Sequence, residues 1–143
     1  MKKFIATSLA ASLLLGMPSL ANADQDARQK IKLPRMMKEH MLGNMRDHML
    51  AIHEIQSALA KSEIDKAADI AEQRIGMSSL ALHNAAHMAP YMPKNMQYIG
   101  TEMHHAASRF AIVVKEGDAL KSLDGLSQIT QQCVACHAAY RLN

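Results

Sequence analysis

The sequence predicts an all-α protein that folds as an antiparallel, up-down-up-down four-helix bundle. Apolar residues recur at spacings of three and four through most of residues 34–141, which is the period of an amphipathic helix. No stretch alternates apolar and polar residues between hairpin turns, as a strand would. The pattern divides into four helices of about 20 to 27 residues with short links, and such helices pack as antiparallel neighbours.

The first two predicted helices lie before a proline-rich break. Pro34 suits the first turn of a helix, and the residues after it that form one face are Met41, Met45, His48, Ile52, Ile55 and Leu59. The segment Ser62-Glu63-Ile64-Asp65 resembles a capping signal that opens the second helix. The inner face of this helix is expected to comprise Ile64, Ala67, Ala68, Ala71, Ile75 and Leu82.

The last two predicted helices follow the break at residues 89–94. Pro90 and Pro93 cannot continue a helix, so a third helix is expected from about Asn95 to Lys115. Gly117 then ends the third helix, and Asp118 caps a fourth helix that continues to Arg141.

The N-terminus has the three regions of a secretory signal peptide. Lys2 and Lys3 precede an apolar run over residues 4–15, and Ala21-Asn22-Ala23 is a small-residue cleavage site. We therefore expect residues 1–23 to be removed and residues 24–143 to form one domain, exported to a bacterial periplasm. An uncleaved membrane anchor is the alternative. No later segment is apolar for long enough to span a membrane after signal cleavage.

Composition excludes several functional classes. The formal net charge of +3 falls to +1 once Lys2 and Lys3 are removed, and no basic stripe remains for a nucleic-acid partner. No nucleophile–base pair or pair of carboxylates suggests catalysis, so the protein is not expected to be an enzyme. The chain has no Trp, and Phe110 is the one Phe beyond the signal, so Leu, Ile, Ala and Met must supply the core.

The chemistry is concentrated in the last residues, QQCVACHAAYRLN. Cys133, Cys136 and His137 would project from a single turn of the fourth helix, because positions i, i+3 and i+4 share a face. C-x-x-C-H is the attachment signal for one covalent haem c, in which two thioethers hold the macrocycle and the histidine binds iron on its proximal side. A redox dithiol, a zinc site and a disulfide are the alternatives, but a βαβ setting and a second paired motif are both missing.

The run Cys133-Val134-Ala135-Cys136-His137-Ala138-Ala139-Tyr140-Arg141 resembles the C-terminal signature of class II c-type cytochromes, the cytochrome c-prime group and its low-spin four-helix relatives. The resemblance implies a periplasmic electron-transport protein with redox partner proteins, and members of this family often form homodimers. It also implies that a side chain of the first helix lies at the sixth position of the iron. A methionine there gives a low-spin electron carrier, whereas an apolar residue leaves an iron that binds NO or CO.

The candidate for that sixth ligand is a methionine of the first helix. Counting residues along antiparallel helices brings His137 level with position 42, between Met41 and Met45. Met45 is the preferred distal ligand, with Met41 as the first alternative and His48, which would give a bis-histidine iron, as the second. Methionines every four residues are also ordinary core filler.

Histidines and methionines beyond the haem motif suggest a second metal. His83 and His87 are four residues apart on the predicted second helix, and the hairpin around residues 90–93 would bring them near Met96 and His104. Imidazole and thioether ligands together suit copper, so a copper-handling cytochrome is a further hypothesis. Scattered surface histidines are the alternative interpretation.

Overall fold

The computed structural model describes residues 26–143, and the predicted signal peptide at residues 1–23 lies outside this range. The described residues are mostly helical, with one very small sheet, which confirms the all-α prediction. Their longer helices are α1 (Arg35–Ala60), α2 (Ile64–Arg74), α4 (Lys94–Val113) and α5 (Ala119–Ala139). None of the helices formed by residues 26–143 is long and apolar enough to cross a membrane.

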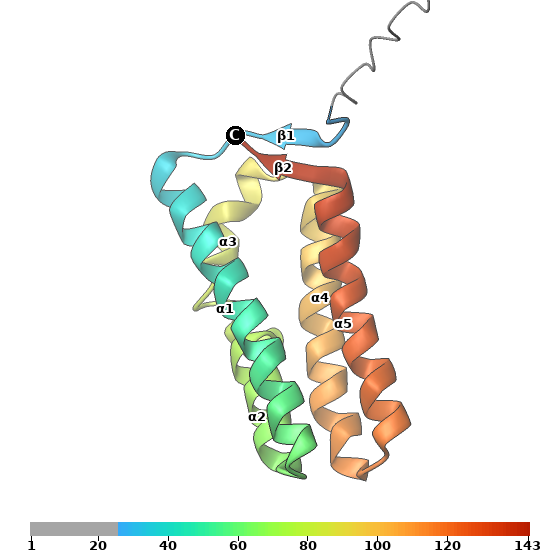
Figure 1. Ribbon diagram of the computed structural model, residues 1–143. Helices are drawn as coiled ribbons and strands as arrows, with labels where there is room; N and C mark the ends of the chain where they lie inside the picture. The colour runs from blue at the N-terminus through green and yellow to red at the C-terminus, as the bar shows by residue number, and fades with distance from the viewer. Residues whose placement is uncertain (1–25) are drawn as a thin grey trace, which may run out of the picture.

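The longer helices lie in two neighbouring pairs (Figure 1). Helix α1 packs against α2, and α4 packs against α5. Contacts between α2 and α4 join the two pairs. The short helix α3 (Ala85–Met88) lies at the end of the molecule that also holds the end of α5.

The ends of α4 and α5 follow the sequence prediction. The carboxylate of Asp118 accepts hydrogen bonds from the backbone N–H groups of Leu120 (2.9 Å) and Lys121 (3.1 Å), so it caps α5. Gly117 has φ of +73°, a left-handed conformation that glycine adopts without a side-chain clash. A 3₁₀ turn, η3 (Val114–Glu116), connects α4 to this glycine.

The second predicted helix is shorter than expected. Helix α2 ends at Arg74 instead of continuing to the break at residues 89–94, because Gly76 takes an extended conformation and a 3₁₀ turn, η1 (Met77–Ser79), follows. Leu82 is therefore 70% exposed and does not belong to the inner face. The predicted cap at Ser62 is also wrong, because the residue directly before α2 is Glu63. Glu63 makes no side-chain capping hydrogen bond, and Ser62 has a left-handed backbone with φ of +59°.

The segment between α2 and α4 is more structured than a single proline-rich break. Residues 80–84 form turns that end at Asn84, whose φ of +54° changes the direction of the chain before α3. A 3₁₀ turn, η2 (Ala89–Tyr91), contains Pro90, and Pro93 directly precedes α4. The two prolines thus stand where a helix begins or cannot continue, as predicted.

The sheet was not predicted from the sequence. Strand β1 (Gln29–Ile31) pairs in parallel with β2 (Tyr140–Leu142), with Gln29 opposite Tyr140 and Ile31 opposite Leu142. Consequently α5 ends at Ala139, two residues before the predicted end at Arg141. Strands of three residues are too short to show the alternation that a sequence pattern requires.

Two groups of buried residues fill the described part of the molecule. The first, which we name the alanine core, joins all four longer helices around Ile55, Phe110 and Ile129. Most of its remaining members are alanines, whose small side chains let helices approach closely. The second group lies nearer β1 and β2 and is rich in methionine.

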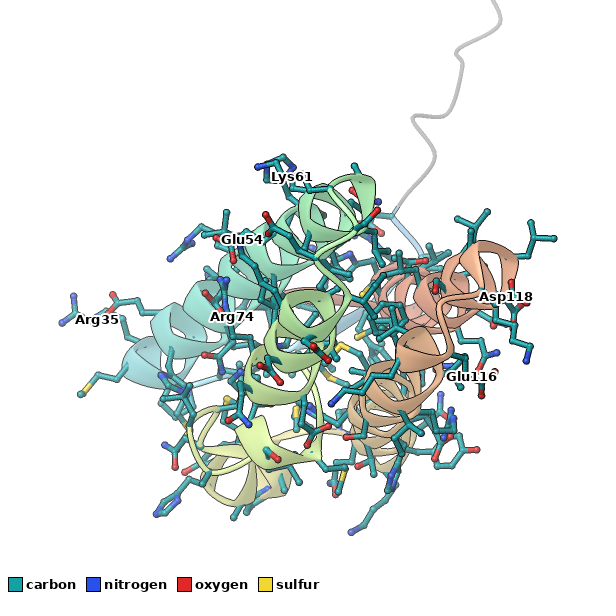
Figure 2. The ribbon with its side chains drawn as sticks, turned by 90° about the horizontal axis from the view of Figure 1, so that it is seen from below. Arg35, Glu54, Lys61, Arg74, Glu116 and Asp118 are labelled. Carbon is teal, nitrogen blue, oxygen red and sulfur yellow. The ribbon has the colours of Figure 1, made fainter. Side chains whose placement is uncertain are left out.

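An ion-pair network links α1 to the end of α2. The Arg74 guanidinium binds the carboxylates of Asp47 and Glu54, and its Nε lies 3.2 Å from Asp47 Oδ2. Figure 2 shows Arg74 and Glu54 side by side in a view from below. The hydrogen bond from Arg74 holds the pKa of Asp47 below its usual value.

Candidate functional site

The C-x-x-C-H motif occupies the last two turns of α5. Cys133, Cys136 and His137 all lie within the helix, so they share one face as predicted. Both cysteines are half-buried and His137 is exposed. The thiol of Cys133 points back along the helix and donates to the Ile129 carbonyl at 3.7 Å.

The two thiols are free and protonated at neutral pH. Burial raises the pKa of Cys133, and burial together with the nearby Cys133 raises that of Cys136. A disulfide-exchange site has the opposite character, because nearby positive charge or a helix N-terminus lowers the thiol pKa there to supply a thiolate. The environment of the pair therefore argues against a redox dithiol.

Methionines surround the side of α5 that carries Cys136. We name this group the methionine cluster: its buried members are Ile31, Leu33, Met41, Met88, Met96 and Tyr140, and its half-buried members are Met37, Met45, Met92, Ile99, Cys136, Ala139 and Leu142. Six of these residues are methionines, contributed by α1, α3, α4 and the segment before α4. Sulfur atoms are also visible in the middle of the molecule in Figure 2. Unbranched thioether side chains adapt to an irregular neighbour more easily than branched ones.

The candidates for the sixth iron ligand lie in two different places: the two methionines near Cys136, and His48 near His83. Met41 is buried in the methionine cluster and Met45 packs against it, so both belong to the same group as Cys136. Met49, the last member of the methionine series on α1, is 72% exposed. His48 faces away from this group, because its Nε2 lies 3.4 Å from Nε2 of His83.

The residues after the motif are held by the N-terminal segment. Tyr140 is buried, and its hydroxyl accepts a hydrogen bond from the Asn95 side chain at 3.2 Å. Arg141 Nε lies 3.3 Å from a carboxylate oxygen of Asp26, which also binds Arg28. The Arg28 side chain donates in turn to the carbonyl of His137 at 3.4 Å.

Three histidine rings meet at a second location. His48 comes from α1, His83 from the turn after η1, and His104 from α4. The ring centroids are 4.7 Å apart for His48–His83 and 5.4 Å apart for His83–His104. Burial, with the charges of His83 and His104, lowers the pKa of His48 to about 4, and burial also lowers the pKa values of the other two rings.

The predicted copper ligands do not assemble as expected. His83 and His87 do not share a helix, because α2 ends at Arg74, His83 lies in the turns of residues 80–84, and His87 lies in α3. His87 is exposed, and Met96 is buried in the methionine cluster. His83 and His104 do meet, but with His48. Among residues 26–143, no group of three or more His, Cys, Asp or Glu side chains is arranged to hold a metal ion.

Sequence reasoning missed the residues that hold His83. Its carbonyl accepts hydrogen bonds from His40 Nε2 (3.1 Å) and from the Asn44 amide (3.2 Å). His40, Asn44 and His48 recur every four residues along α1, so one polar face of the helix contacts His83 three times. The spacing was visible in the sequence, but the position of His83 opposite this face was not.

Comparison of the chain with protein-family models, with curated proteins and with solved structures finds no match in any of the three.

Proposed function

We propose that this protein is a periplasmic monohaem cytochrome of the class II type, which carries single electrons and is not an enzyme. The observation that carries the proposal is the position of Cys133, Cys136 and His137 on one helical face next to the methionine cluster. Two thiols and an imidazole in this order are the donor set for haem c. When bound, haem c supplies the one-electron iron couple.

The residues present fit such a group. Cys133 and Cys136 would form the two thioethers, and the exposed His137 would be the proximal ligand. Raised thiol pKa values are compatible with this role, because a thioether never ionises. Added Cβ atoms at Gly43 of α1 and Gly100 of α4 would meet nothing within 4 Å, so neither position is closely packed.

Met45 is the proposed distal ligand, with Met41 as the alternative. Both side chains belong to the group of residues around Cys136, while the contact of His48 with His83 disfavours a bis-histidine iron. A methionine thioether at this position would favour a low-spin iron, which would change its charge with little rearrangement. This is the property that favours electron transfer over the binding of NO or CO, which is the alternative function.

The proposed fold for this function is an up-down-up-down four-helix bundle of α1, α2, α4 and α5. The pairing of α1 with α2 and of α4 with α5, together with the contacts between α2 and α4, supports it. In this arrangement the ends of α1 and α5 that carry the donor residues lie at the same end of the bundle (Figure 1). Export by the signal peptide at residues 1–23, redox partner proteins and homodimer formation belong to the same proposal.

Covalent attachment is the property to test. The protein should be produced with its signal peptide in a bacterium that matures c-type cytochromes, then denatured and extracted with acidified organic solvent. Haem should remain on the wild-type polypeptide, and Cys133→Ala or Cys136→Ala should each weaken the retention. Gln131→Ala is the matched control, because Gln131 is exposed on the same helix beside the motif. Complete release of haem from the wild-type chain would refute the assignment.

A further inference from the structure

Hydrogen bonds at the three-histidine group determine which ring nitrogens carry hydrogen. The hydroxyl of Ser79 donates to the Gly76 carbonyl at 2.7 Å, so toward His83 Nδ1, at 3.2 Å, it must act as the acceptor. His83 therefore has hydrogen on Nδ1 and a lone pair on Nε2. His104 Nδ1 faces the carbonyl of Ile75, which likewise requires hydrogen on Nδ1.

This pattern matches the outer contacts of metal-binding histidines. A ligating imidazole almost always donates its other ring N–H to a carboxylate, a backbone carbonyl or a water molecule, which fixes the tautomer and the ring orientation. For His83 the hydroxyl of Ser79 is the acceptor in this role, and the backbone of His83 is held by His40 and Asn44. His83 is 4% exposed, so the surrounding side chains keep its ring in one orientation.

The distance between His48 and His83 suits a chelated ion. Two nitrogens, each about 2.05 Å from a tetrahedral ion, are about 3.3 Å apart. The Nε2 atoms of His48 and His83 are 3.4 Å apart. Without an ion, His48 must turn an Nε2–H toward the lone pair of His83, because two facing lone pairs would repel each other.

We propose that Nε2 of His48 and Nε2 of His83 chelate one divalent first-row transition ion of the zinc or copper class. Water completes the coordination, since no third His, Cys, Asp or Glu among residues 26–143 is arranged around the same point. His104 forms the wall beside His83, with the ring centroids 5.4 Å apart. On binding, His48 moves its hydrogen from Nε2 to Nδ1, so no net proton is released.

The site is distinct from the proposed haem site. His87 and Met96 are not among its ligands, because His87 is exposed and Met96 lies in the methionine cluster. His48 is one of its ligands, so His48 could not also bind the haem iron. The proposal therefore does not rest on the presence of haem.

Zinc uptake by the purified, full mature protein provides the test. Equilibrium dialysis against Zn(II), with the metal measured by atomic emission, should give one zinc per chain for wild type. His48→Ala should weaken binding at least tenfold, as should His83→Ala. His53→Ala and His87→Ala are the matched controls, because both rings are exposed, and neither should change uptake. Equal uptake by wild type and His48→Ala, or a loss of uptake in His87→Ala, would overturn the proposal.

A second measurement avoids variants of the buried His83. Diethyl pyrocarbonate modifies accessible, unprotonated histidines, and peptide mass spectrometry locates the modified rings. Zn(II) should slow the modification of His48 relative to His53 and His87 on the same protein. An unchanged rate at His48 in the presence of zinc, with the protein shown to be folded by circular dichroism, would contradict the site.

Discussion

Met41 and Met45 are on consecutive turns of α1, and both pack in the group of residues around Cys136. Their burial differs: Met41 is 6% exposed, whereas Met45 is half-buried. The more buried side chain is the better candidate for a purely structural role, and the less buried one has more freedom to turn toward a ligand. Replacing Met45 should therefore change the iron, whereas replacing Met41 should change the stability of the fold.

In the haem-loaded protein, Met45→Ala should convert a low-spin iron to a high-spin iron that binds carbon monoxide. The reason is that alanine removes the thioether that we propose for the sixth position of the iron. Absorption spectra of the oxidised and reduced protein, with and without carbon monoxide, provide the measurement.

Met41→Ala is the control within the same cluster, and it should leave the spin state unchanged. It should lower the free energy of unfolding by about 2 to 5 kcal/mol, because it removes a buried side chain. A spin-state change in Met41→Ala instead would make Met41 the ligand. A wild-type protein that is already high-spin and binds carbon monoxide would replace electron transfer with gas binding.

At the scale of the elements, β1 holds the end of the chain that follows the C-x-x-C-H motif. Ile31 is 3% exposed, lies opposite Leu142 in the sheet, and belongs to the methionine cluster. Its carbonyl accepts a hydrogen bond from the N–H of Asn143 at 3.2 Å. The N-terminal strand thus buries an apolar side chain in the methionine cluster. This burial supports a two-stranded pairing that would be marginally stable by itself.

Ile31→Ala should loosen this end of the molecule while the alanine core stays folded. The loss of a buried isoleucine costs about 2 to 5 kcal/mol, and here the cost falls mainly on β1 and β2. Hydrogen exchange followed by mass spectrometry should show faster exchange at residues 140–143 and little change in α4. Lys30→Ala, at the exposed neighbouring position, should leave both rates unaltered, and equal effects of the two variants would argue against this role for Ile31.

For the whole molecule, the buried histidines make stability depend on pH. The pKa of His48 is lowered from 6.5 to about 4 in the folded protein, so between these values the unfolded chain binds a proton that the folded chain does not. The lowered pKa values of His83 and His104 act in the same direction. Arg74 also lowers the pKa of Asp47, which adds a further loss of stability at lower pH.

The free energy of unfolding should therefore fall as the pH is lowered from 6.5 to 4. The shift at His48, from 6.5 to about 4, corresponds to about 3 to 4 kcal/mol, since one pKa unit is worth about 1.4 kcal/mol. Urea unfolding at a series of pH values, with EDTA to remove metal ions, gives the measurement. His48→Gln should flatten this part of the profile, whereas His53→Gln, at an exposed position, should not. A wild-type profile without a slope in this range would contradict the neutral state of the buried rings.

Short-range features were correctly predicted because they depend on residues within one or two turns. The capping of α5 by Asp118, the left-handed Gly117 and the common face of Cys133, Cys136 and His137 all follow from local backbone geometry. The burial of Met41 and Ile55 likewise follows from the helical period of α1. In each case the partners are so close in the chain that helix formation alone brings them together.

The sequence by itself therefore determined the start of α1, the extents of α4 and α5 to within a few residues, and the common face of Cys133, Cys136 and His137. Only the tertiary structure decided that β1 pairs with β2, that His48 meets His83 and His104, and that α2 stops at Arg74. These contacts join residues far apart in the chain, and they depend on the path through residues 75–93. Gly76 and Asn84 change the direction of that path, and helical periodicity carries no information about where the chain leads after such a turn.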